Sequence, residues 1–404
     1  MRISYFGTYD RNRPRNRNII NGLKKNNIDV IECHYSLWGD IEDKSSLRGP
    51  LQKIHIFIRF LVAYPYLTLR YLLIGYHDAV IVGYLGHIDI FVAKPLTMLR
   101  RKPLIFDAFL SLYDTVVNDR KLSRPDRFIG RLSFFIDRTA CRMADIVLLD
   151  TNAHIDYFVK TFKIPREKFR RVFVGADETQ FYPKERKENE TPTSLQLTKD
   201  NENVAPTFMV GNLWGINPHA TAETLNVLFY GQFITLHGIE YIVRAAKILE
   251  YDKVEFTIIG IGQEYNRIRN LADELKIKNI RWIDWVKFHK LVAYINEADI
   301  VLGIFGNSDK ARRVIPNKAF QTIACKKPFI TGDSPAAREL FKDRENAVLC
   351  QMGDPTAIAT SICLLRDNED LRKGIAVNGY NTYLSLCNTD AVGKDVKRII
   401  NGEL

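Results

Sequence analysis

Two runs of short apolar strands, each alternating with helical patterns, constrain the fold of this chain more than any other feature. In the first run the segments with the character of buried strands are 3–6, 29–32, 79–82, 104–106, 146–149 and 172–174. In the second run they are 227–230, 256–259, 281–283, 300–303, 329–331 and 348–350. Strands that alternate with helices form parallel sheets covered by helices on both faces. The sequence therefore predicts an α/β protein with two doubly wound, Rossmann-like domains facing a cleft.

A polar segment over residues 184–224 separates the two runs. It is rich in Glu, Asn, Thr and Pro and has little apolar periodicity, which favours a flexible linker or insertion and, in particular, disorder. We therefore expect a first domain over residues 1–183, the linker over 184–224 and a second domain over 225–385. Residues 386–404 are expected to form a C-terminal helix that could pack back on the first domain.

Length and charge narrow the class of protein. A chain of 404 residues with 46% apolar and 26% charged residues has room for two globular domains. Its net charge of +11 predicts an anionic partner, such as a nucleotide sugar, a lipid phosphate or an anionic membrane surface. Nucleic acid is not expected as a partner, because the basic residues are interspersed among Rossmann-like elements and form no nucleic-acid-binding signature.

The cysteines and the N-terminus bear on the compartment. The six cysteines are scattered, with no CxxC pair and no metal-ligand spacing, which favours buried, reduced thiols. The first residues, MRISYFG, have the pattern of a strand, so we expect no signal peptide. A cytoplasmic protein is the expectation, with a possible peripheral site on the cytoplasmic face of the membrane.

The segment 303–333, with the sequence GIFGNSDKARRVIPNKAFQTIACKKPFITGD, places the start of a helix after the end of a strand. Pro316 and Asn317 open this helix, and proline suits the first helical turn because its missing N–H has no partner there. The free N–H groups of a helix start suit a diphosphate. Arg312, Arg313 and Lys318 add positive charge at the same end. A basic loop between a strand and a helix, without any ligand, would show the same pattern.

This segment resembles the donor-sugar motif of the retaining glycosyltransferases of family 4 (group 1), which have the two-domain GT-B fold. The stretch QTIACKKPFI is similar to the helix led by the second glutamate of that motif, and Gln321 stands in place of this glutamate. Arg313 stands eight positions earlier, where the first glutamate would be. One branch of the family carries RVIPNK here and GYxGHxD earlier in the chain, and this sequence has RVIPNK and GYLGHID.

The resemblance implies a glycosyltransferase that moves a sugar, a hexosyl residue, from a nucleotide diphosphate sugar to a glycan or lipid-linked acceptor with retention of configuration. In similar enzymes the C-terminal domain holds the nucleotide sugar and the N-terminal domain holds the acceptor. Cations and helix N-termini stabilise the leaving diphosphate, so no cofactor and no obligatory metal are expected. The acceptor proton would pass to the departing phosphate, without an obligatory protein base.

The resemblance also assigns residues to the donor. Gly231 and Gly238 match glycines of the first strand motif of the family's donor domain. Gln232 and His237 stand where the family has the Arg and Lys that grip the diphosphate, and Gly262 lies in a similar turn, GIGQE. The expected donor-binding residues are Gly231, Gln232, His237, Gly262, Arg313, Asn317, Lys318 and Gln321.

Loops after three strands of the first run supply further candidates. Ligands bind at the carboxyl ends of strands in open α/β sheets, and the loop GTYDRNRPRNRN places four arginines there. The expected catalytic residues are His87, Asp107 and Arg312, and the expected acceptor-binding residues are Gly7, Arg15, Arg17 and Asp89. Alternative interpretations remain open: the arginine-rich loop could be a solvated basic turn, His87 could be structural, and Asp107 could cap the next helix.

The segment 51–76 is strongly apolar but contains Lys53, Arg59, Pro65 and Arg70. A membrane-spanning helix needs about 20 apolar residues with few charges, so this segment is not expected to span a membrane. Apolar faces with interspersed cations suit a helix at a membrane interface. The segment could equally be a buried helix pair of the first domain.

Two other functions remain open at this stage. A sugar-nucleotide epimerase can share the two-Rossmann arrangement, and it would turn over a nucleotide sugar without any acceptor. An inactive nucleotide-sugar-binding subunit is the second alternative, because both glutamates of the family motif are missing. The base and sugar of the donor, the acceptor, the linkage and the oligomeric state are not predictable from the sequence.

Overall fold

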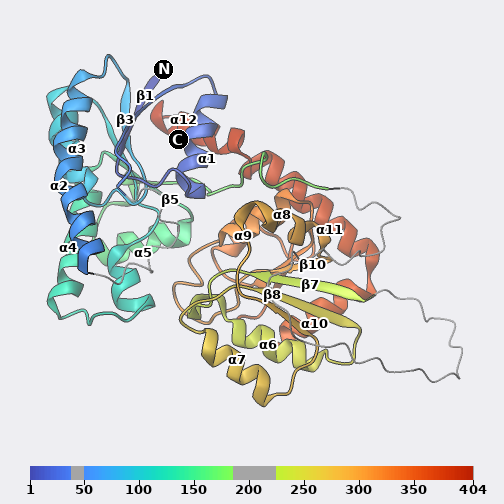
Figure 1. Ribbon diagram of the computed structural model, residues 1–404. Coiled ribbons are helices and arrows are strands. Elements are labelled where there is room, and N and C mark those ends of the chain that lie inside the picture. The colour runs from blue at the N-terminus through green and yellow to red at the C-terminus, as the bar shows by residue number, and fades with distance from the viewer. Residues whose placement is uncertain (38–49, 185–223, 404) are drawn as a thin grey trace, which may run out of the picture.

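A computed structural model describes residues 1–37, 50–184 and 224–403, and for residues 50–57 it describes the helical backbone only. The expected disorder of 184–224 therefore falls almost wholly outside the described residues. Within them the chain forms two parallel sheets, each flanked by helices (Figure 1). This arrangement confirms the predicted α/β class with two doubly wound domains.

The N-terminal sheet has the strand order β2-β1-β3-β4-β5-β6, and every neighbouring pair is parallel. Its strands are β1 (Arg2–Gly7), β2 (Asp29–His34), β3 (Ala79–Val82), β4 (Leu104–Asp107), β5 (Ile146–Leu149) and β6 (Phe169–Arg171). The central strands β3 and β4 are buried along their whole length, as expected when helices cover both faces of a parallel sheet.

The C-terminal sheet has the order β12-β11-β10-β7-β8-β9 and is also parallel throughout. Its strands are β7 (Leu225–Tyr230), β8 (Val254–Ile259), β9 (Ile280–Ile283), β10 (Ile300–Leu302), β11 (Phe329–Gly332) and β12 (Val348–Cys350). Every strand predicted for the second run is present, because short β-branched and aromatic runs between helical patterns are a strong signal for buried parallel strands.

Helices cover both faces of each sheet. On the N-terminal sheet α1 (Pro14–Lys25) and α12 (Thr389–Ile400) pack against one face. The other face carries α2 (Pro50–Leu73), α3 (Asp89–Leu99), α4 (Phe128–Met143) and α5 (Asn152–Phe162). The C-terminal sheet is covered by α6 (Ile239–Ile248), α7 (Tyr265–Glu274), α8 (Phe288–Glu297), α9 (Asn317–Ala324), α10 (Pro355–Asp367) and α11 (Glu369–Thr382).

The predicted strand over 172–174 is wrong. β6 ends at Arg171, and the next residues are buried but leave the sheet. Side chains of α1 hold this segment, because Arg15 donates to the Val172 oxygen and Asn18 Nδ2 donates to the Val174 oxygen at 2.9 Å. Val172 N makes one last hydrogen bond to the Leu149 oxygen of β5 at 2.8 Å, whereas Phe173 and Val174 pack in a core of the C-terminal domain. The apolar character of the segment therefore reflects its burial as the chain passes from one domain to the other.

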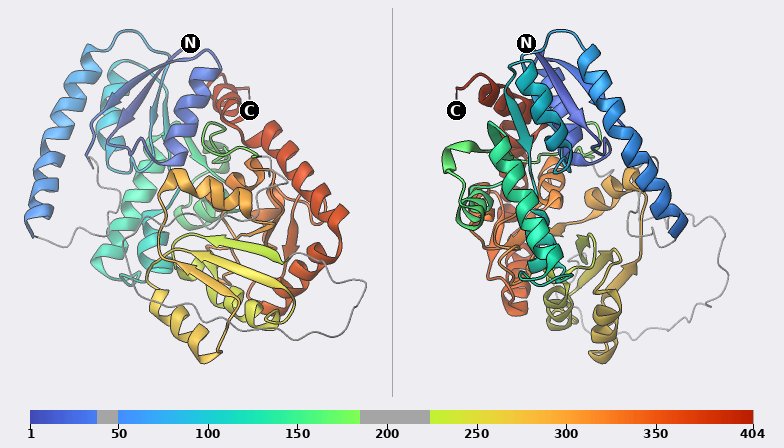
Figure 2. Two further views of the ribbon diagram at one scale, coloured as in Figure 1. Left: turned by 45° about the vertical axis from the view of Figure 1, so that its right-hand side comes forward. Right: turned by 90° about the vertical axis from the view of Figure 1, so that its left-hand side faces the viewer.

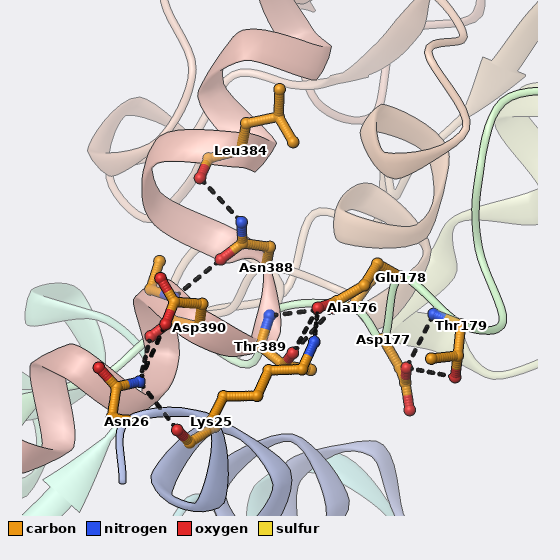
Figure 3. Close-up of polar contacts among 12 residues, drawn as sticks. Lys25, Asn26, Ala176, Asp177, Glu178, Thr179, Leu384, Asn388, Thr389 and Asp390 are labelled. Carbon is orange, nitrogen blue, oxygen red and sulfur yellow. Dashed lines mark hydrogen bonds and ion pairs between the residues drawn. The ribbon is translucent and has the colours of Figure 1, made fainter.

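The last helix of the chain lies on the first domain, beside α1 (Figure 1). Polar contacts at this crossing are drawn in Figure 3, where Glu178 accepts hydrogen bonds from Lys25 and from Thr389 Oγ1. Burial opposes ionisation of Glu178, but these hydrogen bonds outweigh it and hold its pKa below the usual value. Asn26 Nδ2 donates to the Asp390 backbone oxygen at 3.0 Å.

Two glycines let α1 and α12 approach closely. A Cβ added to Gly393 would lie 2.1 Å from the backbone carbon and oxygen of Gly22, far inside van der Waals contact. We expect Gly393→Ala to reduce the free energy of unfolding by about 1–3 kcal/mol, the usual cost of overpacking. Gly374→Ala in α11 is the matched control, because a Cβ there meets nothing within 4 Å. Urea unfolding of both variants is the measurement, and an equal effect of the two would contradict this packing.

Candidate active site

The loop after β7 and the start of α9 meet at the carboxyl edge of the C-terminal sheet. Gly231 follows β7 with φ of 145°, and a Cβ there would lie 3.0 Å from His237 Cε1 and 3.2 Å from Lys318 Nζ. Glycine therefore leaves the backbone open beside these two side chains. Gly231, His237 and Lys318 form what we call the β7–α9 cluster, and all three are among the residues predicted from the sequence.

Lys318 is the most unusual member of the β7–α9 cluster, because its side chain is only 4% exposed. Its ammonium lies 3.7 Å from the ring centroid of Phe229 and 3.5 Å from the Gly303 carbonyl oxygen. No carboxylate of the described residues forms an ion pair with it. Burial lowers the pKa of Lys318 well below the usual value for lysine. A buried cation that lacks an anionic partner in the described part of the chain is suited to receive an anion.

His237 stands beside this cation in its neutral form. Burial, followed by the charge of Lys318, holds the pKa of His237 well below its usual range. His237 Nδ1 lies 2.5 Å from the Gln232 backbone oxygen, and a carbonyl oxygen can only accept. Nδ1 therefore carries the proton and Nε2 is left as an acceptor, suited to a hydroxyl group. Gln232 contacts His237 through its backbone oxygen only, and the side chain of Gln232 is exposed.

The start of α9 adds backbone donors to the cluster. The N-cap residue Pro316 makes no side-chain hydrogen bond to the helix, and no acidic residue occupies the first turn. The first N–H groups of a helix have no partner within it, and they carry a partial positive charge. Asn317 begins the helix and is exposed. These donors and Lys318 come from one helical turn, which is the combination expected at a diphosphate site.

Gln321 lies one turn further along α9 and is 6% exposed. Its Oε1 accepts a hydrogen bond from Tyr230 OH at 2.9 Å. The amide nitrogen of Gln321 donates to none of the described residues, so a donor remains available. Tyr230 was not predicted as a site residue. It is the last residue of a buried strand, which a sequence pattern assigns to the hydrophobic core, and only the structure shows that it contacts α9.

The two arginines before α9 do not join the β7–α9 cluster. Arg312 is exposed and donates to Asn307 Oδ1 at 2.9 Å. Arg313 instead reaches the N-terminal domain, where it pairs with Asp114 at 2.9 Å and stacks over the Tyr157 ring at 4.0 Å. The structure therefore does not place Arg313 beside Lys318, where the sequence predicted it.

Further contacts hold the same loop against the N-terminal domain. Lys310 pairs with Asp119 at 2.7 Å, and Thr151 Oγ1 donates to the Arg313 backbone oxygen at 2.5 Å. Glu339 accepts from the backbone N–H groups of Asn152 and Ala153 at 2.8 and 2.9 Å, at the start of α5. Lys310 and Arg313 of the loop that leads into α9, and Glu339 after β11, are thus all held by residues of the N-terminal domain. No signal within one sequence could have paired them.

His87 is buried and fully surrounded by protein. Its Nε2 lies 3.0 Å from the Leu110 oxygen and 3.4 Å from Asp137 Oδ1, while Nδ1 has no hydrogen-bond partner among the described residues. Burial lowers the pKa of His87, although Asp137 opposes this. Asp137 also accepts from Ser111 Oγ at 2.7 Å. His87 therefore braces the 110–113 loop in this conformation, which agrees with the structural alternative.

Asp89 fixes the loop after β1. It accepts from Thr8 N at 2.7 Å and from Tyr64 OH at 3.0 Å, and burial raises its pKa to about 6 against these hydrogen bonds. A Cβ on Gly7 would lie 2.3 Å from Asp89 Oδ2, so Gly7 permits this close approach. Gly7 ends β1 and Asp89 begins α3, and the two residues lie in contact.

Arg15 and Asp107 form a buried ion pair. Their side chains are 1% and 0% exposed and approach to 2.8 Å, and Arg15 also donates to the Val172 oxygen. Every oxygen and nitrogen of this pair that could reach a ligand is engaged within the protein. We therefore assign the pair to the architecture between β4 and α1, in place of the expected acceptor and catalytic roles. Arg17 is less enclosed and pairs with Asp177 at 3.3 Å.

Gly262 joins two loops of the C-terminal domain. A Cβ there would lie 2.6 Å from the Phe233 oxygen, so the glycine allows the loops after β7 and β8 to lie side by side. Phe233 N donates to the Ile261 oxygen at 2.9 Å across the same junction. Gly262 therefore supports the position of the 231–237 loop. The backbone of Phe233 covers one side of Gly262, so a ligand cannot reach Gly262 from that side.

The described residues contain no group of three or more His, Cys, Asp or Glu side chains placed to hold a metal ion. All six cysteines are free, and five of them are buried. The β7–α9 cluster offers a buried ammonium, a helix start and a neutral histidine acceptor, and Gln321 beside it adds an amide donor.

Comparison with solved structures identifies the fold as GT-B. Sucrose-phosphate synthase from Thermosynechococcus elongatus superposes with a TM-score of 0.68 and 15% identity, over 100% of this chain and 98% of that one. Anabaena HepE, solved in complex with UDP, superposes with a TM-score of 0.66 and 12% identity, over 99% of each chain.

Sequence comparison gives the family. The family model "Glycosyl transferases group 1" matches residues 218–382, which include the whole β7–α9 cluster. An uncharacterised glycosyltransferase of Methanocaldococcus jannaschii is 25% identical over 152 residues, which are 38% of this chain and 41% of that protein. The lipopolysaccharide core biosynthesis glycosyltransferase LpsD of Rhizobium meliloti is 22% identical over 162 residues, 40% of this chain and 45% of that protein.

Residues 218–382 match the group 1 glycosyltransferase family, and the chain as a whole has the GT-B fold. Its sequence matches cover less than half the length of these two curated relatives. The predicted resemblance to group 1 is thereby confirmed for residues 218–382.

Proposed function

We propose that this protein transfers a sugar from a nucleoside diphosphate sugar, bound at the β7–α9 cluster, to a glycan or lipid-linked acceptor held by the N-terminal domain. The observation that carries the proposal is Lys318, a buried cation without a carboxylate partner in the described residues, at the uncapped start of α9. A diphosphate would supply the missing negative charge. Binding of UDP by HepE, which shares the fold, is consistent with this ligand class.

Departure of the nucleoside diphosphate is the step that this cluster would assist. As the sugar–phosphate bond breaks, negative charge grows on the leaving phosphate, and fixed cations and helix N–H groups stabilise it without reorganising. Lys318 and the α9 start are such groups, so the proposed mechanism needs no metal. The acceptor hydroxyl would give its proton to the leaving phosphate on the same face of the sugar, which accounts for retention. We expect a hexosyl residue as the transferred group.

The nucleotide class is tested first. We would measure the melting temperature of the protein with UDP, GDP and ADP and with their hexose derivatives, because a ligand that binds the folded state stabilises it. The best donor is then incubated with glycan and lipid-linked acceptors, and the anomeric configuration of the product is read by NMR. A product of inverted configuration, or stabilisation by none of the nucleotides, would contradict the proposal.

The two alternatives give different results in the same assay. An epimerase would convert the nucleotide sugar into its epimer with no acceptor present. A binding subunit would be stabilised by the nucleotide sugar but would form no product with any acceptor.

Gln321 is expected to hydrogen-bond the donor ribose. Its side chain lies on α9 one turn after Lys318, with its Oε1 held by Tyr230 and its amide nitrogen available. We expect Gln321→Ala to weaken nucleotide binding about threefold to tenfold, the value of one neutral hydrogen bond. Gln321→Glu should retain binding, because a carboxylate accepts from both Tyr230 and a ribose hydroxyl. Calorimetric titration is the measurement. Equal affinity of all three proteins would show that the side chain does not contact the donor.

A further inference from the structure

The outer surface of the N-terminal domain carries an unusual number of exposed apolar side chains. The helix α2 is apolar on both sides: Ala63, Leu67 and Tyr71 are buried against the sheet, while the opposite face is open. This open face includes Leu69 and Leu73, which are 60% and 75% exposed. Residues 51–73 thus belong to one continuous helix, whose described side chains are covered on one face only, and not to the buried helix pair considered above. Helices that are apolar all round are normally covered all round.

The helix α4 presents a second apolar stripe, which the sequence analysis did not identify. Phe128, Leu132 and Phe135 recur at intervals of four and three residues and so lie on one face of the helix. Phe128 and Phe135 are 77% and 61% exposed. An exposed phenylalanine is unfavourable in water, and two on one helical face form a patch that favours a partner.

The two stripes point the same way. The inner faces of α2, α3 and α4 pack against one face of the N-terminal sheet, so their outer faces are directed away from it together. The right panel of Figure 2 looks onto this layer of helices from outside. We call this surface, formed by the outer faces of α2, α3 and α4 and by the segment that leads into α4, the α2–α4 face.

The charges on the α2–α4 face are almost all positive. Exposed cations are Arg70 on α2, Arg101 at the end of α3, and Lys121, Arg124, Arg127 and Arg131 around the start of α4. The exposed carboxylates among the described residues near these helices are Asp126, which pairs with Arg124 at 3.3 Å, and Asp145 after α4, which pairs with Lys94 of α3 at 3.2 Å. The surface therefore combines apolar stripes with a surplus of positive charge, which fits an anionic lipid surface.

From the described residues we infer that the α2–α4 face binds the surface of an anionic lipid bilayer. No helix among the described residues is long and apolar enough to cross a membrane, so the contact is peripheral. A second copy of the chain is a poorer occupant, because pairing two such faces would bring like charges together. The inference does not depend on the proposed sugar transfer, since lipid binding can be measured without donor or acceptor.

Flotation with vesicles tests this surface directly. The full-length protein should float with vesicles that contain phosphatidylglycerol at low salt, bind less at high salt, and bind pure phosphatidylcholine weakly. Phe128→Ser and Phe135→Ser should each weaken binding about tenfold, through loss of apolar burial. Arg127→Gln and Arg131→Gln should each weaken it about fivefold, with anionic vesicles only.

A matched control separates this face from general stickiness. Tyr251 is 91% exposed and lies in the C-terminal domain, so Tyr251→Ser should float like the parent. All variants should keep the melting temperature of the parent, because the changed side chains are exposed. Absence of flotation at low salt would overturn the inference. So would equal loss of binding in Tyr251→Ser, or a dimer that dissociates in Phe128→Ser while vesicle binding is absent.

Discussion

Replacement of Lys318 by methionine should raise the melting temperature of the ligand-free protein and abolish its stabilisation by nucleoside diphosphates. Methionine has a similar length and suits a site beside the Phe229 ring. Removing a buried charge in favour of an apolar side chain is worth about 1–4 kcal/mol of stability. Loss of a charge-assisted hydrogen bond to the diphosphate costs about 1.5–3 kcal/mol of binding, or roughly tenfold to a hundredfold in affinity. A residue needed only for folding would not combine a higher melting temperature without ligand with a loss of nucleotide binding.

The pH dependence gives an independent check on Lys318. Burial lowers the pKa of this lysine in the folded protein, whereas in the unfolded chain its pKa has the usual value of about 10.4. Between these two values the unfolded chain binds more protons, so the stability of the parent rises with pH there. The advantage of Lys318→Met should therefore be largest below the lowered pKa and shrink as the pH rises through it. Thermal unfolding at a series of pH values measures this, and a difference that does not change with pH would contradict a lowered pKa of Lys318 in the folded protein.

Replacement of Asp107 by alanine should cause the largest loss of stability. It leaves the guanidinium of Arg15 buried without its carboxylate partner, which costs about 3–5 kcal/mol. The double variant Arg15→Met, Asp107→Leu removes both charges and should lose much less, because no unpaired charge remains buried. The control is Asp126→Ala, whose exposed ion pair with Arg124 should contribute less than about 1 kcal/mol.

Urea unfolding distinguishes this structural role from a catalytic one. If Asp107 acted on the substrate alone, Asp107→Ala would unfold at the same urea concentration as the parent and lose only activity. If the pair is architectural, the double variant should recover most of the lost stability. A double variant as unstable as Asp107→Ala would contradict the account of the Arg15–Asp107 pair.

The order of strands and helices could be predicted from the sequence because each element carries its own local signal. The segment 172–174 misled the prediction, since apolar residues buried between domains look like a strand until their carbonyl groups are seen to accept from Arg15 and Asn18. The outer stripe of α4 was missed for a related reason. Apolar residues at helical spacing are normally core, and only the structure shows which face is covered.

The candidate site was partly predictable for the same reason. Gly231, His237 and Lys318 meet because all three follow strand ends of one sheet, and parallel strands bring their carboxyl ends to one edge. Arg313 does not join them, because Asp114 and Tyr157 of the other domain hold it. Arginine and aspartate at strand ends look like ligand-binding residues in any sequence. Whether they bind a ligand or each other, as Arg15 and Asp107 do, depends on contacts between segments far apart in the chain.

The most direct test of the β7–α9 cluster is calorimetric titration of the parent and of Lys318→Met with the preferred nucleoside diphosphate and with its nucleoside. Diphosphate binding should restore the pKa of Lys318 and so take up protons at alkaline pH, a signal that depends on the ionisation enthalpy of the buffer. We predict that the parent binds the diphosphate far more tightly than the nucleoside, and that Lys318→Met loses both this preference and the proton uptake. Equal binding of the diphosphate by both proteins, without proton uptake, would contradict a diphosphate site at Lys318.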